Sequence, residues 1–421
     1  MRLSSRSVVL ASLIAVGATG LLGCGGDDAG KGESDITDVP QTPVERQSIG
    51  NCWLYAQASW VESMHLTATG DELDISQSYW TYWHWYGEIL EGYGDEIATG
   101  GNQGTANEIA AQRGLMNEPD FVAEDATSEM SSRQSSALEA VNRELAEGGR
   151  LSTSTARNDA ALVRQVLDEA WQLSADVKEQ LDRVFGSDGS QTLDRGASVE
   201  GTSIISADDL QVAYTERQTD PDAPTSKTTN LTEAMEDWQN ASYPSSGSNL
   251  DSRRRQLQIR VQRALHDRQP VVVTWNVDFN AMESRMNELR GSFNMTTLGE
   301  LGPGRQGGHM TVMEDYQAET EDFGTLAAGV TLDPDNEEDA AKLEAALLPS
   351  TTLSFIRIKN SWGGFRDDRA SAPGFPGYHD LYLDYLNGPL KWCPDVTATK
   401  TDSNCTGRQP GLRAVALPPG Y

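Results

Sequence analysis

The chain has 421 residues, a formal net charge of −30, and 38% hydrophobic and 23% charged residues. This composition is typical of a globular protein with a buried core, and the length suits one catalytic unit that carries insertions. The negative charge repels phosphate groups and anionic lipid headgroups, which argues against nucleic-acid binding and against charge-driven attachment to membranes.

The first residues resemble a bacterial lipoprotein signal. Arg2 and Arg6 precede an apolar segment, residues 8–22, and the small residue Gly23 precedes Cys24. The apolar segment is shorter than the ~20 residues that a membrane-spanning helix needs. The resemblance implies a signal peptide over residues 1–23, acyl chains on Cys24 and a lipidated tether over residues 24–46. More than one acyl chain would be attached, and stable anchoring to a membrane needs two such signals. It places the protein in a bacterial cell envelope, at the outer membrane or cell surface. An ordinary signal peptide or a short membrane helix is the alternative.

Helical periodicity recurs through the first part of the chain, and no internal repeat is found. The predicted helices cover residues 52–65, 73–90, 136–146, 159–184 and 253–267. Ser76 is suited to cap the second of them. Residues 186–247 are rich in Ser, Thr, Asp and Asn with little periodicity, so we expect an insertion or lid there.

Three β-branched or apolar runs predict strands in the second half, at residues 270–275, 309–316 and 353–359. Between the last two, residues 317–350 are acidic and are expected to form a surface loop. A long insertion at this point costs little entropy.

The chain has four cysteines, Cys24, Cys52, Cys393 and Cys405. The last two lie close together in the sequence, and export to an oxidising compartment allows them to form a disulfide. Two free thiols are the alternative for this pair.

Cys52 follows Gly50 and Asn51 and opens the first predicted helix. A helix start presents free amide groups and a partial positive charge, so we expect the pKa of this thiol to be lowered. The same amides can donate to an oxyanion. A buried structural cysteine is the alternative, since cysteines commonly fill cores.

The second half supplies the partners that a nucleophilic thiol requires. His309 follows two glycines at the start of a predicted strand, and Asn360 follows another strand in the sequence Asn-Ser-Trp-Gly. A thiol needs a base that accepts its proton, and the base needs an acceptor that orients its second ring nitrogen. Glycines such as Gly308 allow a substrate backbone to approach closely.

These motifs, in this order, resemble those of papain-like cysteine peptidases from Gln47 to about Tyr385. Residues 75–80 and 99–103 are most similar to the bleomycin hydrolase and bacterial aminopeptidase branch. The resemblance implies an α+β, papain-like fold with two lobes, in which a helical lobe carries the nucleophile helix and an antiparallel β lobe carries the histidine and asparagine. The peptidase domain is expected at residues 47–395, with insertions at about 122–250 and 317–350, followed by a C-terminal tail at 396–421 that contributes to the disulfide.

The resemblance also implies a role for each matching residue. Cys52 would be the nucleophile, His309 the general base and acid, and Asn360 the amide that holds the imidazole. Trp362 would shield the hydrogen bond between Asn360 and His309 from water. Gln47 would help to bind the oxyanion, although it lies one position closer to Cys52 than is usual in the family. Gly100 and Gly101, like Gly308, would contact the substrate.

The sequence therefore predicts a lipid-anchored thiol peptidase that hydrolyses peptides or proteins through an acyl-enzyme intermediate. We expect a bell-shaped pH profile whose acidic limb reports formation of a Cys52–His309 ion pair. The alternatives are a catalytically inactive, peptidase-fold binding protein and a transglutaminase-like enzyme, which would orient its histidine with a carboxylate. No cofactor and no metal are expected, because the other histidines have no metal-ligand spacing with cysteines or carboxylates: His65, His84, His266 and His379.

Overall fold

The computed structural model describes residues 39–92, 94–218, 223–330, 332–364, 366, 369–393, 405 and 407–421. The predicted signal segment and Cys24 lie outside these residues. The fold is mixed α+β, as the sequence predicts at this level. None of the helices in the described ranges combines the length and apolar character needed to cross a bilayer.

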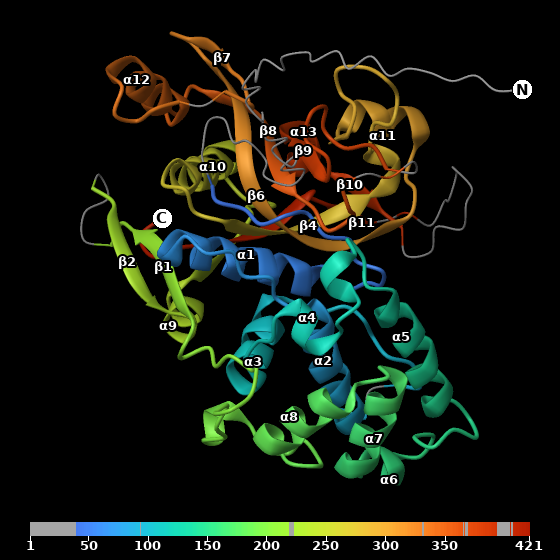
Figure 1. The fold of residues 1–421 in the computed structure, drawn as a ribbon. Helices are drawn as coiled ribbons and strands as arrows, with labels where there is room; N and C mark the ends of the chain where they lie inside the picture. Colours follow the sequence, from blue (N-terminus) through green and yellow to red (C-terminus); the bar gives the residue numbers. More distant parts are fainter. Residues whose placement is uncertain are drawn as a thin grey trace, which may run out of the picture.

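Helices dominate the first half of the described chain (Figure 1). They are α1 (Cys52–Thr69), α2 (Gln77–Glu91), α3 (Gln103–Arg113), α4 (Glu118–Phe121), η1 (Asp125–Thr127), α5 (Ser132–Leu145), α6 (Ser154–Arg157), α7 (Ala160–Ala170), α8 (Ala175–Phe185) and η2 (Leu193–Arg195). As predicted, α1 begins at Cys52, and Ser76 caps α2 by accepting a hydrogen bond from the amide of Tyr79 at 3.1 Å.

One of the predicted helices is divided into two separate helices in the structure. Residues 159–184 divide into α7 and α8 because Gln172 adopts a left-handed conformation with φ of 50°. The side chain of Ser174 then caps the new helix by accepting from the amide of Val177 at 3.2 Å.

An eight-stranded sheet dominates the second half of the described chain, in the order β3–β12–β4–β6–β8–β9–β5, with β7 paired to β6. Its strands are β3 (Gln239–Ser242), β4 (Val271–Asp278), β5 (Ser292–Phe293), β6 (Gln306–Thr320), β7 (Gly324–Leu326), β8 (Thr352–Lys359), β9 (Tyr378–Tyr382) and β12 (Leu412–Leu417). The β5–β9 pair is parallel and the other pairs are antiparallel. The three predicted strands fall in β4, β6 and β8.

The remaining elements lie near α1 or around the sheet (Figure 1). They are the hairpin β1 (Gln211–Glu216) and β2 (Thr225–Asn230), the pair β10 (Leu390–Trp392) and β11 (Gly407–Gln409), and the helices α9 (Leu231–Asp237), α10 (Leu250–His266), η3 (Phe279–Ala281), α11 (Met295–Leu301), α12 (Glu337–Ala346) and α13 (Leu383–Asn387).

Three segments are more ordered than the sequence predicts. The 186–247 segment, expected as an insertion or lid, holds β1, β2 and α9 and supplies the edge strand β3. The acidic 317–350 segment extends β6, pairs it with β7, and forms α12, which Asn336 caps. The expected tail, 396–421, supplies β11 and β12, and β12 lies inside the sheet between β3 and β4.

Helix α1 lies between the helices and the sheet (Figure 1). It is buried along most of its length, which matches its apolar character on every side. Met310 and Val312 of β6 pack into the core of the helical half, whereas Met313 and Tyr316 pack into the core on the other side of the sheet. The start of α1 is therefore held against the strand that carries His309.

Candidate active site

Cys52 is the first residue of α1, and its side chain is 9% exposed. The preceding residue, Asn51, is fixed by its side-chain Nδ2, which donates to Thr81 Oγ1 at 3.0 Å and to Gln134 Oε1 at 3.1 Å. A side chain at Gly50 would place its Cβ 2.5 Å from Thr99 Oγ1. The turn before Cys52 is therefore closely packed, which sets the position of the thiol.

The backbone amides of Met310, Trp53 and Cys52 itself act on the sulfur of Cys52. These amides lower the pKa of the thiol, but burial has the larger effect and raises it to about 11. The lowered pKa predicted from the helix start is therefore wrong for this structure, because desolvation outweighs the amides. Met310 is the residue after His309, so the thiol lies close to the strand of the histidine.

His309 is oriented by Asn360. The Nε2 of His309 lies 2.8 Å from Asn360 Oδ1, and the same oxygen accepts from the amide of Ser361 at 2.8 Å. The backbone donor fixes which end of the carboxamide faces the ring. Because a carboxamide oxygen can only accept, the neutral imidazole carries its hydrogen on Nε2 and keeps a lone pair on Nδ1. This is the tautomer that a general base for a thiol requires.

Two tryptophans enclose the imidazole of His309. Trp362 stacks on it, with ring centroids 4.8 Å apart and planes 20° apart, and Trp275 meets it edge-on at 5.4 Å. Burial lowers the pKa of His309 to about 4, while the bond to Asn360 acts to raise it and the charge of Arg369 acts to lower it further. The rings exclude water from the bond between His309 and Asn360.

Trp275 was missed by the sequence reasoning. It lies on β4 directly opposite His309 of β6 in the antiparallel register. The spacing of Trp275 and His309 in the sequence does not indicate that they are in contact. The contact follows only from the pairing of β4 with β6 in the sheet.

Gln47 lies beside the turn that carries Asn360. Its amide donates to Ser361 O at 3.0 Å, and its side-chain Oε1 accepts from Ser361 Oγ at 2.6 Å. Its Nε2 donates to Ile49 O at 2.6 Å and has a second hydrogen to give. Gln47 is thus fixed near the histidine-asparagine pair.

The three candidate substrate-binding glycines have different surroundings. A Cβ at Gly101 would lie 2.4 Å from the ring of Trp53, whose Nε1 donates to Thr99 O at 3.0 Å. A Cβ at Gly100 would meet nothing within 4 Å, and Gly100 lines a cavity of about 520 Å³. Gly308 is exposed directly before His309. Packing against Trp53 therefore requires glycine at 101. A Cβ would have room at Gly100 and at Gly308, and the role of these glycines in substrate binding stays a prediction.

Cys393 and Cys405 are joined in a disulfide, with Cα atoms 4.2 Å apart. The amide of Cys393 donates to the side chain of Gln306, at the start of β6, at 2.8 Å. Within the described ranges, Cys52 is the one free cysteine.

The other histidines pack against protein groups. His65 bonds Gln211 O, His84 meets Trp53 edge-on, His266 bonds Tyr316 OH, and His379 meets Trp362 edge-on. In the described part of the chain, three carboxylates lie close enough together that they could hold a metal ion, and no histidine is among them: Glu45, Asp74 and Glu118.

No protein-family model matches the chain, and neither does any curated protein. The chemistry of the site therefore rests on its geometry. A buried thiol at a helix start lies against the strand of an imidazole, and that imidazole is oriented by a neutral amide and enclosed by two indoles.

Proposed function

We propose that the protein is a cysteine peptidase of papain-like fold that hydrolyses peptide bonds through Cys52, His309 and Asn360. The observation that carries the proposal is the 2.8 Å contact between His309 Nε2 and Asn360 Oδ1, which leaves Nδ1 free to act as a base. The effect of the Met310 amide on the pKa of the Cys52 thiol supports it, because a group that acts on the thiol in this way lies close to it and is next to His309.

The proposed reaction begins with attack of the Cys52 sulfur on the peptide carbonyl as His309 Nδ1 takes the thiol proton. The imidazolium then gives this proton to the leaving amine, which departs and leaves a thioester on Cys52. Water, deprotonated by His309, hydrolyses the thioester and releases the acid. Charge on the carbonyl oxygen would be stabilised by the amide of Cys52 and the second hydrogen on Gln47 Nε2.

The arrangement of the lobes supports the papain-like part of the proposal. The nucleophile helix α1 is buried between the helices and the sheet, and the histidine and asparagine come from neighbouring strands, β6 and β8. An orienting amide in place of a carboxylate weighs against a transglutaminase-like enzyme.

The proposal is tested by incubating the purified protein with fluorogenic peptides and an unfolded protein substrate. We expect hydrolysis that an epoxide inhibitor of thiol peptidases abolishes. Absence of turnover with every substrate, together with tight peptide binding, would instead favour an inactive binding protein.

The enzyme should stay active to a lower pH than an imidazole with the ordinary pKa of 6.5 would allow, since burial lowers the pKa of His309 to about 4. The base form is lost as the pH falls through the folded-state pKa, so we expect kcat/KM to halve near pH 4. The acidic limb would then report protonation of His309 from a neutral pair, in place of the ion pair that the sequence suggested. The measurement is kcat/KM against pH.

The folded state must be monitored at each pH at which kcat/KM is measured. Because the folded-state pKa is depressed, the neutral imidazole contributes stability that is present above pH 6.5 and lost as the pH falls toward 4. Circular dichroism at each pH separates unfolding from loss of the base. A limb centred at pH 6.5 in a protein that stays folded would contradict the buried position of His309.

The lipid anchor at Cys24 stays a prediction from the sequence. Its proposed location is the envelope of a bacterial cell, where two acyl signals would retain the enzyme. We expect labelled palmitate to enter the wild-type protein and not the Cys24→Ala variant, which should leave the membrane fraction. Equal labelling of both proteins would refute the anchor.

A further inference from the structure

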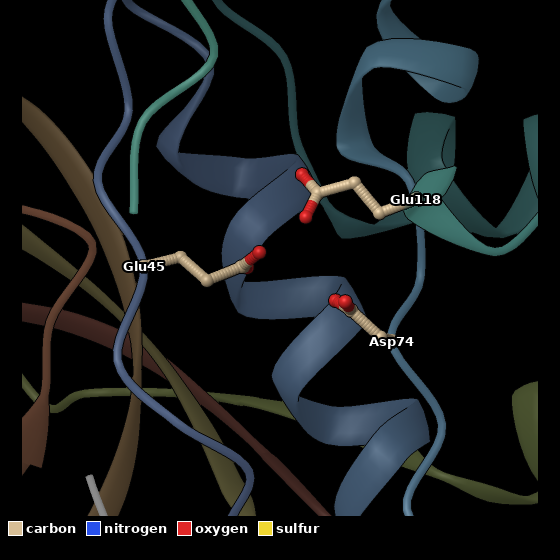
Figure 2. A group of neighbouring side chains, drawn as sticks. All are labelled: Glu45, Asp74 and Glu118. Carbon is tan, nitrogen blue, oxygen red and sulfur yellow. The ribbon is translucent and has the colours of Figure 1, made fainter. Parts of the chain in front are cut away.

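Three carboxylates from distant parts of the sequence converge beside α1 (Figure 2). Glu45 lies before α1, Asp74 lies in the connection between α1 and α2, and Glu118 is the first residue of α4. One oxygen from each lies within 4.8 Å of the others. All three line a cavity of about 400 Å³, whose other acidic lining residues include Glu62, Glu72 and Asp125.

Glu118 is the unusual member of this cluster. Its side chain is only 7% exposed, and no hydrogen bond or ion pair from the described residues reaches its carboxylate. Figure 2 shows it directed toward Glu45 and Asp74. Burial has the largest effect on the pKa of Glu118, and the negative charges of Asp74, Asp125 and Glu62 act in the same direction. Together they raise this pKa to about 8. A buried carboxylate among other carboxylates is costly unless a cation or a proton compensates it.

The nearby cation is engaged elsewhere. Lys359 donates to Thr42 Oγ1 at 2.9 Å, and Thr42 donates to Glu62 at 2.5 Å. Burial raises the pKa of both Glu62 and Glu45, and the charge of Lys359 acts in the opposite direction, toward their ionised forms. The lysine therefore compensates one side of the cluster and leaves Glu118 without a described partner.

A buried amide with an unpartnered oxygen adjoins the cluster. Gln77 is fully buried, and its Nε2 donates to Glu45 Oε2 at 2.5 Å. The oxygen of the same amide has no hydrogen-bond partner among the described residues. Gln77 is not one of the residues that line the cavity, so it would support the site by holding the Glu45 carboxylate in place and not as a ligand.

We propose that Glu45, Asp74 and Glu118 bind a calcium ion in this cavity. Carboxylate oxygens are hard ligands, and the absence of a histidine or cysteine in the cluster disfavours zinc. Ca²⁺ takes about six to eight oxygen ligands in a flexible geometry, whereas Mg²⁺ usually keeps several waters and binds only one or two carboxylates. Three carboxylates whose oxygens lie within 4.8 Å of one another therefore suit calcium better, and the cavity has room for waters that complete its coordination.

The ion would join the two parts of the molecule. Glu45 belongs to the segment that leads to Gln47, and its carbonyl accepts from the amide of Gly363 at 3.1 Å. Asp74 and Glu118 belong to the helical half, where the amide of Glu118 donates to Asp74 O at 2.9 Å. Calcium should therefore stabilise the fold by holding the segment before α1 against the helices, whether or not the protein is a peptidase.

The test is calorimetric titration of the full protein, freed of metal by a chelator, with CaCl₂ and separately with MgCl₂ near neutral pH. We expect one Ca²⁺ per chain, bound in the range of about 10⁻⁴–10⁻³ M that extracellular calcium modules show, and tighter than Mg²⁺. The midpoint of thermal unfolding should rise with the Ca²⁺ concentration, as linkage requires.

Variants locate the site. Glu118→Gln should weaken calcium binding about tenfold or more, because it removes one of three charged ligands. Asp74→Asn, at an exposed position that cannot compromise the core, should do the same. Glu72→Gln lines the same cavity outside the cluster and is the matched control, with binding unchanged. Absence of Ca²⁺ binding at about 10 mM, preference for Mg²⁺, or equal binding by Asp74→Asn and Glu72→Gln would overturn the proposal.

Discussion

Replacing Cys52 with alanine should abolish peptide hydrolysis, with a loss in kcat on the order of 10⁴-fold or more, as removal of the nucleophile does in other triad enzymes. The sulfur forms the covalent bond to the acyl group, and no described neighbour can replace it, because Cys52 is the one free cysteine in the described ranges. The measurement is initial-rate hydrolysis of a fluorogenic peptide by the wild-type and variant proteins.

The fold should survive this change. Cysteine to alanine removes one atom at a position that is already 9% exposed, so the free energy of unfolding should change by no more than about 2 kcal/mol. Cys52→Ser is the second variant, since it keeps the shape and replaces only the sulfur. Near-normal turnover in either folded variant would rule out Cys52 as the nucleophile.

His309→Ala should cost roughly 10²–10⁴-fold in kcat, the range that general acid–base catalysis supplies. Without the imidazole, the buried thiol has no base to take its proton, and its raised pKa of about 11 keeps it protonated at neutral pH. Asn360→Ala should cost much less, about tenfold, because it removes one hydrogen bond worth about 0.5–1.5 kcal/mol. Single-turnover kinetics of the three proteins measures this order.

Loss of an imidazole from a packed site can also reduce activity by loosening the fold, so a matched control is needed. His266→Ala removes an imidazole that forms a hydrogen bond with Tyr316 OH. Tyr316 lies in the core on the side of the sheet away from α1. The substitution should lower stability without a comparable loss in kcat. If His266→Ala and His309→Ala lost activity equally, the effect of His309 would be structural and not catalytic.

The elements around the candidate site were predictable because their signals are local. The start of α1 at Cys52 follows from a glycine turn before an apolar run, and the Ser76 cap follows from its side-chain chemistry. The strands of His309 and Asn360 show β-branched and apolar runs that need no knowledge of their neighbours.

The features that the sequence did not reveal depend on distant contacts. Trp275 meets His309 only because β4 and β6 pair, and β12 enters the sheet by pairing with β3 on one side and β4 on the other. The pKa of Cys52 was predicted in the wrong direction because the helix-start amides are local, whereas burial by β6 is not. The carboxylate cluster was missed because Glu45, Asp74 and Glu118 come together only in the folded chain.

The most direct test of the central claim is to treat the purified protein with an epoxide inhibitor of thiol peptidases and to map the adduct by mass spectrometry after digestion. The account predicts one adduct, on Cys52, formed rapidly in the wild-type protein and much more slowly in His309→Ala, because the imidazole activates the thiol. An unmodified Cys52 in active protein, or modification at the same rate without His309, would contradict it.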